Sequence, residues 1–158
     1  MSFFSVVVTG ALATGALLFA SVPESDPEPS PELTPEEVVR IQVEALQAND
    51  SPTPDAGIAA AFRFASPGNR AATGPLPRFT QMVKLGYADM LGFADAEYGA
   101  VQVVSDRAQQ AVTLVQRDGR RTTYVFALSR QSGGPYDGCW MTDGVGTRPA
   151  ATNGMRRI

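Results

Sequence analysis

The residues of this sequence that could carry chemistry are aspartates, tyrosines and arginines. The chain of 158 residues contains no histidine, which removes histidine-based triads, the usual proton shuttle near neutral pH and histidine-bearing zinc sites. Its single cysteine, Cys139, can form neither an intrachain disulfide nor a Cys-x-x-Cys metal site. Cys139 lies between Gly138 and Trp140 with no base beside it. We therefore interpret it as a small buried packing residue and not as a reactive thiol.

Two arginines and one distant aspartate form the main polar constellation. Arg63 and Arg70 flank a Ser-Pro-Gly-Asn turn, and Asp143 lies near the end of the chain. One interpretation is an Arg–Asp pair that ties a helix end to the last strand. The other is an anion-binding or catalytic cluster. In the catalytic alternative Asp143 or Asp137 acts as a base with a tyrosine as proton donor, and burial must raise the pKa of that carboxyl group.

Aromatic residues form the second candidate site. Tyr124 and Phe126 share one face of a predicted strand, and Trp140 lies on the next strand. If helices cover this face, these side chains lie near Phe62 and Phe79. They then form either part of the core or an aromatic-lined pocket for an apolar or mixed ligand. The predicted ligand-binding residues are Arg63, Arg70, Phe79, Tyr124, Phe126, Trp140 and Asp143.

Charge and motifs exclude several classes of partner. The net charge is −3 and the isoelectric point is near 4.9, so the chain has no general attraction for phosphate backbones and nucleic acid is not an expected partner. The acids in turns do not form a calcium-binding loop. Gly133-Gly134 lacks the Lys-Ser/Thr that follows a phosphate-binding loop. We therefore expect neither a metal nor a cofactor.

The N-terminal segment is hydrophobic and uncharged. Phe3–Val22 carries no charge, and about 20 residues at ~1.5 Å per residue are enough to cross the hydrocarbon core of a bilayer. The alternatives are a retained membrane anchor, a cleaved signal and a buried soluble helix. Residues 23–33 alternate proline with acid, which predicts an extended, solvated spacer.

Capping signals predict the helices that follow. Thr34, Pro35 and Glu37 form a capping box with proline at the first helical position. Thr53–Asp55 repeats the cap-plus-proline signal for a second helix that ends near Ala65. The residues expected to face the core are Val38, Ile41, Ala45 and Ala48, widened by Val39, Val43 and Leu46, and then Ile58, Ala61, Phe62 and Ala65.

Ser66–Arg70 is expected to break the second helix, because proline disfavours the helical conformation of the residue before it. Arg78–Leu85 predicts a third, short helix. From Tyr98 the pattern alternates with period two, and Asp118-Gly119 indicates a hairpin with a primed turn. The predicted strand segments are residues 101–104, 111–116, 122–129 and 139–142.

Helices followed by a meander predict an α+β fold. We expect two to three helices packed on a curved antiparallel meander of about four strands, preceded by the hydrophobic N-terminal helix. The predicted organisation is a signal or anchor at 1–22, a linker at 23–33, the domain at 34–145 and a mobile tail at 146–158.

Three motifs resemble an uncharacterised family. They are residues 61–67 (AFRFASP), 81–83 (QMV) and 134–143 (GPYDGCWMTD). The family, a domain of unknown function in small proteins of bacteria and photosynthetic eukaryotes, resembles the chain over Thr34–Val145 and implies no reaction or cofactor. The order of elements is also similar to the nuclear-transport-factor-like (cystatin-like) α+β cone, in which a curved sheet wraps helices and leaves a pocket. Some cones use the pocket for catalysis and many use it for binding.

These observations favour a binding or interaction module held at, or exported across, a membrane through Phe3–Val22. Its partner would be a protein or a small apolar ligand, and an accessory subunit of a membrane complex fits the same pattern. The alternative is a cofactor-independent, cone-fold enzyme that acts on a small organic ligand through Asp and Tyr groups. The acidic flank after Val22 favours delivery of the domain to the far side of the membrane, so the expected location is extracytoplasmic, in the periplasm or alternatively in a plastid or thylakoid lumen.

Overall fold

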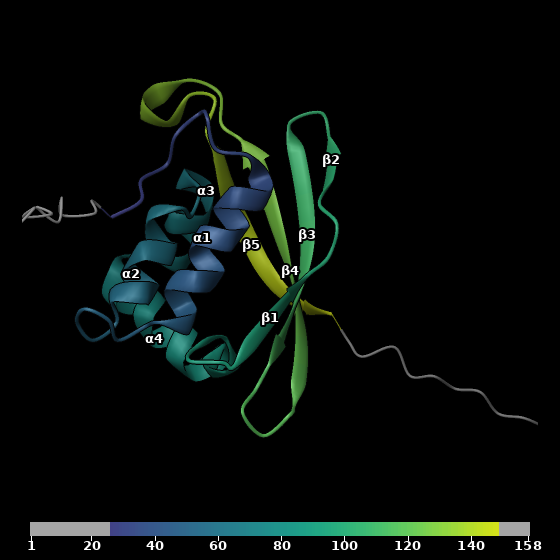
Figure 1. Cartoon of the computed structure of the whole chain (residues 1–158). Helices are drawn as coiled ribbons and strands as arrows, with labels where there is room; N and C mark the ends of the chain where they lie inside the picture. The colour runs from purple at the N-terminus through teal and green to yellow at the C-terminus, as the bar shows by residue number, and fades with distance from the viewer. Residues whose placement is uncertain (1–25, 149–158) are drawn as a thin grey trace, which may run out of the picture.

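A computed structural model describes residues 26–148 (Figure 1). Helices come first and one antiparallel sheet follows, so the predicted α+β class is confirmed. Figure 1 shows the helices gathered on one side of the sheet. The predicted hydrophobic segment Phe3–Val22 lies outside the described residues, and within 26–148 no helix is both long and apolar enough to cross a membrane. The helices are α1 (Pro35–Gln47), α2 (Ala56–Arg63), α3 (Pro67–Thr73), α4 (Leu76–Gly86), η1 (Ala88–Met90) and η2 (Gly134–Tyr136), and the strands are β1 (Asp95–Tyr98), β2 (Gln102–Val104), β3 (Arg107–Val115), β4 (Arg121–Arg130) and β5 (Trp140–Arg148).

The start of α1 is the predicted capping box. The Thr34 hydroxyl accepts a hydrogen bond from the Glu37 amide (3.2 Å), and the Glu37 carboxylate accepts one from the Thr34 amide (2.7 Å). The bond from the Thr34 amide, and after it a bond from the Thr34 hydroxyl (2.8 Å) to the same carboxylate, lower the pKa of Glu37. The buried face differs from the prediction, because it is centred on Gln42 and leaves Ile41 half-buried. The buried residues of α1 are Pro35, Val38, Val39, Gln42, Val43 and Leu46.

Helix α2 is not capped by the predicted Thr53–Asp55 signal. Asp55 has φ +63° and makes no side-chain cap. The first amide of α2, Ala56 N, bonds to the Thr53 carbonyl (3.2 Å). The next two bond to Asn49, which follows α1: the Asn49 carbonyl accepts from Gly57 N (2.9 Å) and its side-chain oxygen accepts from Ile58 N (3.0 Å). This contact satisfies free helix amides and explains why the polar Asn49 is buried.

Ser66–Arg70 does break the second helix, but it also begins another one. Ser66 is extended (φ −61°, ψ 157°), and its hydroxyl accepts from Asn69 N at 3.2 Å. Serine followed by proline is an N-cap with proline at the first helical position, as well as a break signal. Helix α3 was therefore not predicted, because Ser66-Pro67 was interpreted as a break signal alone.

The sheet has the order β1-β3-β4-β5, and β2 also pairs with β3. β1 pairs with residues 112–115 and β2 with residues 107–109, so both occupy one edge of the sheet. The predicted meander of about four strand positions is thus confirmed. Between β1 and β2, the three residues 99–101 lie opposite only two residues of β3, 110 and 111. This edge therefore contains one extra residue, which interrupts and bends an edge strand.

The β3–β4 hairpin forms at the predicted Asp118-Gly119, but its loop is wider than a two-residue primed turn. Gln116 N bonds to Arg120 O at 2.8 Å, which leaves three residues in the loop, with Gly119 at φ +84°. Three-residue loops with a left-handed glycine are the next commonest hairpin connection. Beyond the loop β4 alternates as predicted, with Tyr124, Phe126 and Leu128 buried against the helices.

Strand β5 is longer than predicted and joins the two layers. It continues to Arg148, so residues 146–148 belong to the sheet and not to a mobile tail. On its free side Ala65 forms a parallel bridge with Thr142. Ser66 N donates to Thr142 O (2.9 Å), and Thr142 N donates to Phe64 O (2.8 Å). The α2–α3 junction is therefore attached directly to the sheet.

Asp143 is an extra residue in β5. Its neighbours Thr142 and Gly144 pair with the consecutive residues Leu128 and Ala127 of β4, so Asp143 has no opposite residue. A bulge of this kind bends the strand and increases its twist. The bend lies beside the contact between β5 and the helices, where the candidate site is found.

Candidate functional site

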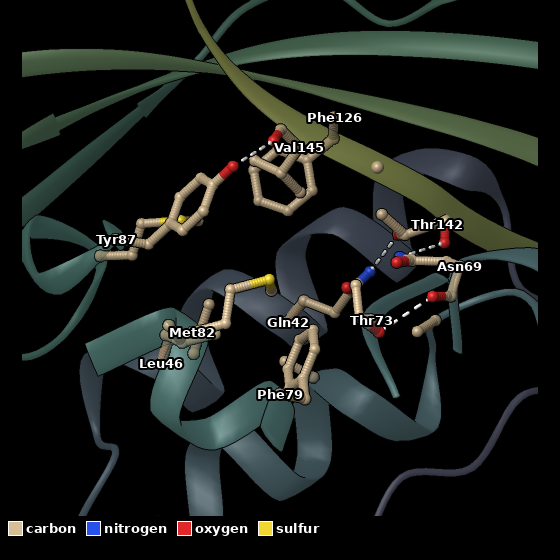
Figure 2. Close-up of a pocket in the computed structure, with 15 residues that line it drawn as sticks. Gln42, Leu46, Asn69, Thr73, Phe79, Met82, Tyr87, Phe126, Thr142 and Val145 are labelled. Atoms are coloured by element: carbon tan, nitrogen blue, oxygen red, sulfur yellow. Dashed lines mark hydrogen bonds between the residues drawn. The ribbon is translucent and has the colours of Figure 1, made fainter. Parts of the chain in front are cut away.

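A cavity of about 240 Å³, here called the sheet–helix pocket, lies between α1–α4 and strands β4 and β5 (Figure 2). A second hollow of about 430 Å³ is larger, but it is a surface groove lined by exposed residues such as Asp50, Ser51 and Lys84. We therefore regard the sheet–helix pocket as the candidate site. Its lining consists of Gln42, Leu46, Ala61, Ala65, Asn69, Thr73, Phe79, Met82, Val83, Tyr87, Met90, Phe126, Thr142, Gly144 and Val145.

The larger part of the pocket wall is apolar. Figure 2 shows Phe126 of β4 and Phe79 of α4 on opposite walls, with Leu46 and Met82 toward the Tyr87 end. Phe126 is buried, whereas Phe79 and Met82 are half-buried. The wall formed by α4 therefore reaches the surface, which gives a small molecule a route to the cavity.

The opposite end of the pocket is polar but uncharged. Gln42 Nε2 donates to the Thr142 hydroxyl oxygen at 2.7 Å and to the Val38 carbonyl at 3.2 Å. Asn69 Nδ2 donates to the Thr142 carbonyl at 3.0 Å, and the Thr73 hydroxyl donates to the Asn69 carbonyl at 2.9 Å. These bonds join α1, α3 and β5, and they fix the side chains at this end (Figure 2).

Tyr87 is the one titratable residue in the lining given above. Its hydroxyl donates to the Val145 carbonyl at 3.1 Å, and its ring centre is 6.2 Å from that of Tyr124. Within residues 26–148, neither a carboxylate nor a basic side chain lines the pocket. Among the described residues, the pocket therefore offers uncharged amides and hydroxyls beside an apolar wall.

The aromatic predictions divide into two groups. Phe79 and Phe126 line the sheet–helix pocket as expected. Tyr124 and Trp140 are buried in the core cluster and lie outside the pocket lining. Burial, followed by the charge of Asp89, raises the pKa of Tyr124, so its hydroxyl stays protonated near neutral pH.

The two predicted arginines lie on the outside of the α2–α3 junction. Arg63 forms ion pairs with Asp26 (3.1 Å) and Glu28 (3.3 Å). The described part of residues 23–33 is therefore in contact with the domain, although the side chains of Asp26 and Glu28 stay mostly exposed, and the extended, solvated spacer stays a prediction. Arg70 donates to the Tyr136 hydroxyl at 3.1 Å and lies 5.3 Å from the ring centres of Phe62 and Tyr136. Neither arginine reaches Asp143, so the predicted Arg–Asp pair is wrong.

Asp143 is held by other partners on the bulge of β5. Ser129 Oγ donates to it at 2.9 Å, and Arg107 Nη1 lies 3.6 Å from its carboxylate. Asp137 accepts a hydrogen bond from Gly133 N at 2.6 Å. Both aspartates are thus outside the pocket lining. Cys139 is buried as predicted, and burial raises the pKa of its thiol.

The polar residues of the pocket were missed by sequence reasoning. One signal could have indicated Gln42: it lies among Val38, Val39, Val43 and Leu46 on the apolar face of α1. A polar side chain in the middle of such a face must find a partner in the core. Asn69 and Thr142 gave no comparable signal, because their partners are distant in sequence.

The fold and the pocket define a small α+β domain with an internal cavity of ligand size. The chain belongs to the family described as "Domain of unknown function (DUF4864)", which matches residues 30–154. This confirms membership of an uncharacterised family, as expected from residues 61–67, 81–83 and 134–143, while the range of organisms stays a prediction. Searches among curated proteins and among solved structures gave no significant match.

Proposed function

We propose that this domain binds a small, uncharged and largely apolar molecule in the sheet–helix pocket. The observation that supports this proposal is the lining: aromatic and aliphatic side chains over most of the wall, with uncharged amides and hydroxyls at one end. Ligand sites combine an apolar wall with a few placed polar groups in this way. A dry cavity of about 150 Å³ holds benzene. By the same measure the 240 Å³ here suits a molecule of roughly 8–12 non-hydrogen atoms.

Catalysis receives less support from the geometry. The enzyme alternative needs Asp143 or Asp137 beside a tyrosine in a cavity, and both carboxylates bond to groups outside the pocket lining. The cone-like arrangement of sheet and helices stays a prediction, and a pocket between two such layers is compatible with it. Fold alone would not distinguish binding from catalysis.

The first test compares a neutral probe with a charged probe of similar shape. Ligand-observed ¹⁹F NMR of the full chain should show binding of 4-fluorotoluene and much weaker binding of 4-fluorobenzoate, because a carboxylate pays a large desolvation cost in an uncharged cavity. Ala61→Leu, which places a larger side chain on the pocket wall, should weaken 4-fluorotoluene binding at least about tenfold by occupying the cavity.

The matched control is Ala59→Leu, on the same helix but half-exposed and outside the lining. It should bind 4-fluorotoluene as the wild type does. Met82→Trp fills the pocket from α4 and serves as a second test if Ala61→Leu impairs folding. Equal binding of both probes by the wild type, or undiminished binding by a folded filled variant, would contradict the proposal.

Membrane attachment through Phe3–Val22 and an extracytoplasmic location are part of the same proposal, with a protein partner or an accessory-subunit role as its extension. The support is the uncharged length of that segment. Alkaline carbonate extraction of membranes from expressing cells tests it. We expect the full chain to stay in the membrane pellet, and quantitative release into the supernatant would contradict a retained anchor.

A further inference from the structure

Gln42 presents to the pocket an acceptor that the described protein leaves without a partner. The residue is 4% exposed, and its Nε2 donates to the Val38 carbonyl (3.2 Å) and the Thr142 hydroxyl (2.7 Å). A carbonyl can only accept, so the amide nitrogen must face Val38 and Oε1 must point elsewhere. No hydrogen bond from residues 26–148 reaches Gln42 Oε1, and this oxygen is not one of the buried, unpartnered atoms of the described residues, so it is accessible from the cavity that Gln42 lines.

The other polar groups of the lining have the same bias toward acceptors. Asn69 Nδ2 donates to the Thr142 carbonyl, and the Thr73 hydroxyl donates to the Asn69 carbonyl. At the far end the Tyr87 hydroxyl donates to Val145. Each of these three bonds ends on a backbone carbonyl, and the donor hydrogens left over are the second N–H of Asn69 Nδ2 and the hydroxyl hydrogen of Thr142, whereas Gln42 Oε1, Asn69 Oδ1 and Tyr87 Oη all keep lone pairs. The side chains around the cavity offer more acceptors than donors.

We propose that the ligand carries a neutral hydrogen-bond donor, an N–H or O–H group, and places it against Gln42 Oε1 and Asn69. This inference rests on the proposed function and assigns the chemistry of the ligand's polar end. An anionic head would lie against oxygens of the same partial charge. A cationic head would find no carboxylate in the lining to compensate its desolvation. Figure 2 shows Gln42, Asn69, Thr73 and Thr142 together at this end, so the apolar body of the ligand extends toward Met82 and Tyr87.

Three probes of nearly identical two-ring shape test the inference: indole carries an N–H group, benzofuran an oxygen and indene a methylene at the same position. Their affinities for the full chain are measured by saturation-transfer NMR titration. We expect indole to bind about tenfold more tightly than benzofuran. The indole N–H gains a hydrogen bond, whereas the benzofuran oxygen faces the acceptor oxygens of Gln42 and Asn69. In Gln42→Leu the ratio of the indole affinity to the benzofuran affinity should fall to about one or below. The affinity for indene should change less than about twofold.

The matched control is Gln81→Leu, which removes an exposed glutamine of α4 outside the lining. It should keep the wild-type ratio. The double variant Gln42→Leu/Thr142→Val removes both partners of the buried side-chain bond. No buried hydroxyl is then left without a hydrogen-bond partner at position 142, so the double variant keeps the test valid if the single variant folds poorly.

The outcomes separate this inference from the proposed function. If indene binds but indole is no tighter than benzofuran, or if the ratio persists in Gln42→Leu, the donor assignment is overturned and the apolar pocket stands. If none of the three probes binds the wild type, the proposed function fails and this inference fails with it.

Discussion

Gly57→Ala is expected to destabilise the domain by about 3–5 kcal/mol, more than most overpacking substitutions. A Cβ atom at Gly57 would lie 2.0 Å from the Ala45 carbonyl oxygen and 2.7 Å from Asn49 Cα. These are backbone atoms of the α1 end, which cannot move aside like a flexible side chain. The two helices would have to separate, and the Gly57–Asn49 hydrogen bond would be lost with them.

Gly68→Ala is the matched control, because Gly68 and Gly57 are both the second residue of a helix. The nearest atom to a Cβ at Gly68 is Ser66 Oγ at 4.0 Å. Alanine should therefore be neutral or stabilise by roughly 0.5 kcal/mol through its higher helix propensity. Thermal unfolding by circular dichroism should show a Tm lower by roughly 10–25 °C for Gly57→Ala. A Tm near that of the wild type would contradict the close contact of α1 and α2.

Phe64→Ala is expected to cost about 3–5 kcal/mol, the range for truncating a fully buried phenylalanine. Phe64 is 0% exposed and belongs to the core cluster. The hydrogen bond from Thr142 N to the Phe64 carbonyl can persist in the variant. The decrease in the free energy of unfolding therefore comes from the lost side-chain packing and the cavity left behind. Urea unfolding followed by the fluorescence of Trp140, the one tryptophan of the chain, gives the change in midpoint at constant slope.

Phe62→Ala provides the comparison two residues earlier. Phe62 is half-buried and packs on Phe79, with ring centres 5.0 Å apart. We expect a loss of about 1–2 kcal/mol, because less apolar surface is exposed on truncation. If Phe62→Ala destabilised the protein as much as Phe64→Ala, the assignment of Phe64 as the core residue of this junction would be wrong.

Local signals predicted the fold well where the partners are close in sequence. The Thr34–Glu37 capping box and the alternation of β4 depend on neighbouring residues, and both are confirmed. Helix α3 was missed because Ser66-Pro67 both ends and begins a helix. The Asn49 cap of α2 and the extra residue in β5 depend on how separate elements meet, so no local pattern encodes them.

The candidate site was less predictable for the same reason. Phe79 and Phe126 were found because large apolar residues on inward faces must meet in the interior. Arg63, by contrast, pairs with Asp26 and Glu28 and not with Asp143. A charged side chain near a surface can form an ion pair with any of several partners, and these pairs differ little in free energy. Residue type alone therefore does not determine the pairing.

The position of β5 in the chain determines when the sheet–helix pocket can be assembled. It supplies Thr142 and Val145 to the pocket and is the last described element of the chain. During synthesis, the helices and the β3–β4 hairpin emerge before it and can begin to associate. The sheet–helix pocket cannot form until β5 has been synthesised, so a chain truncated before Trp140 would leave the apolar side chains of α1 and α4 that line the pocket uncovered on that side.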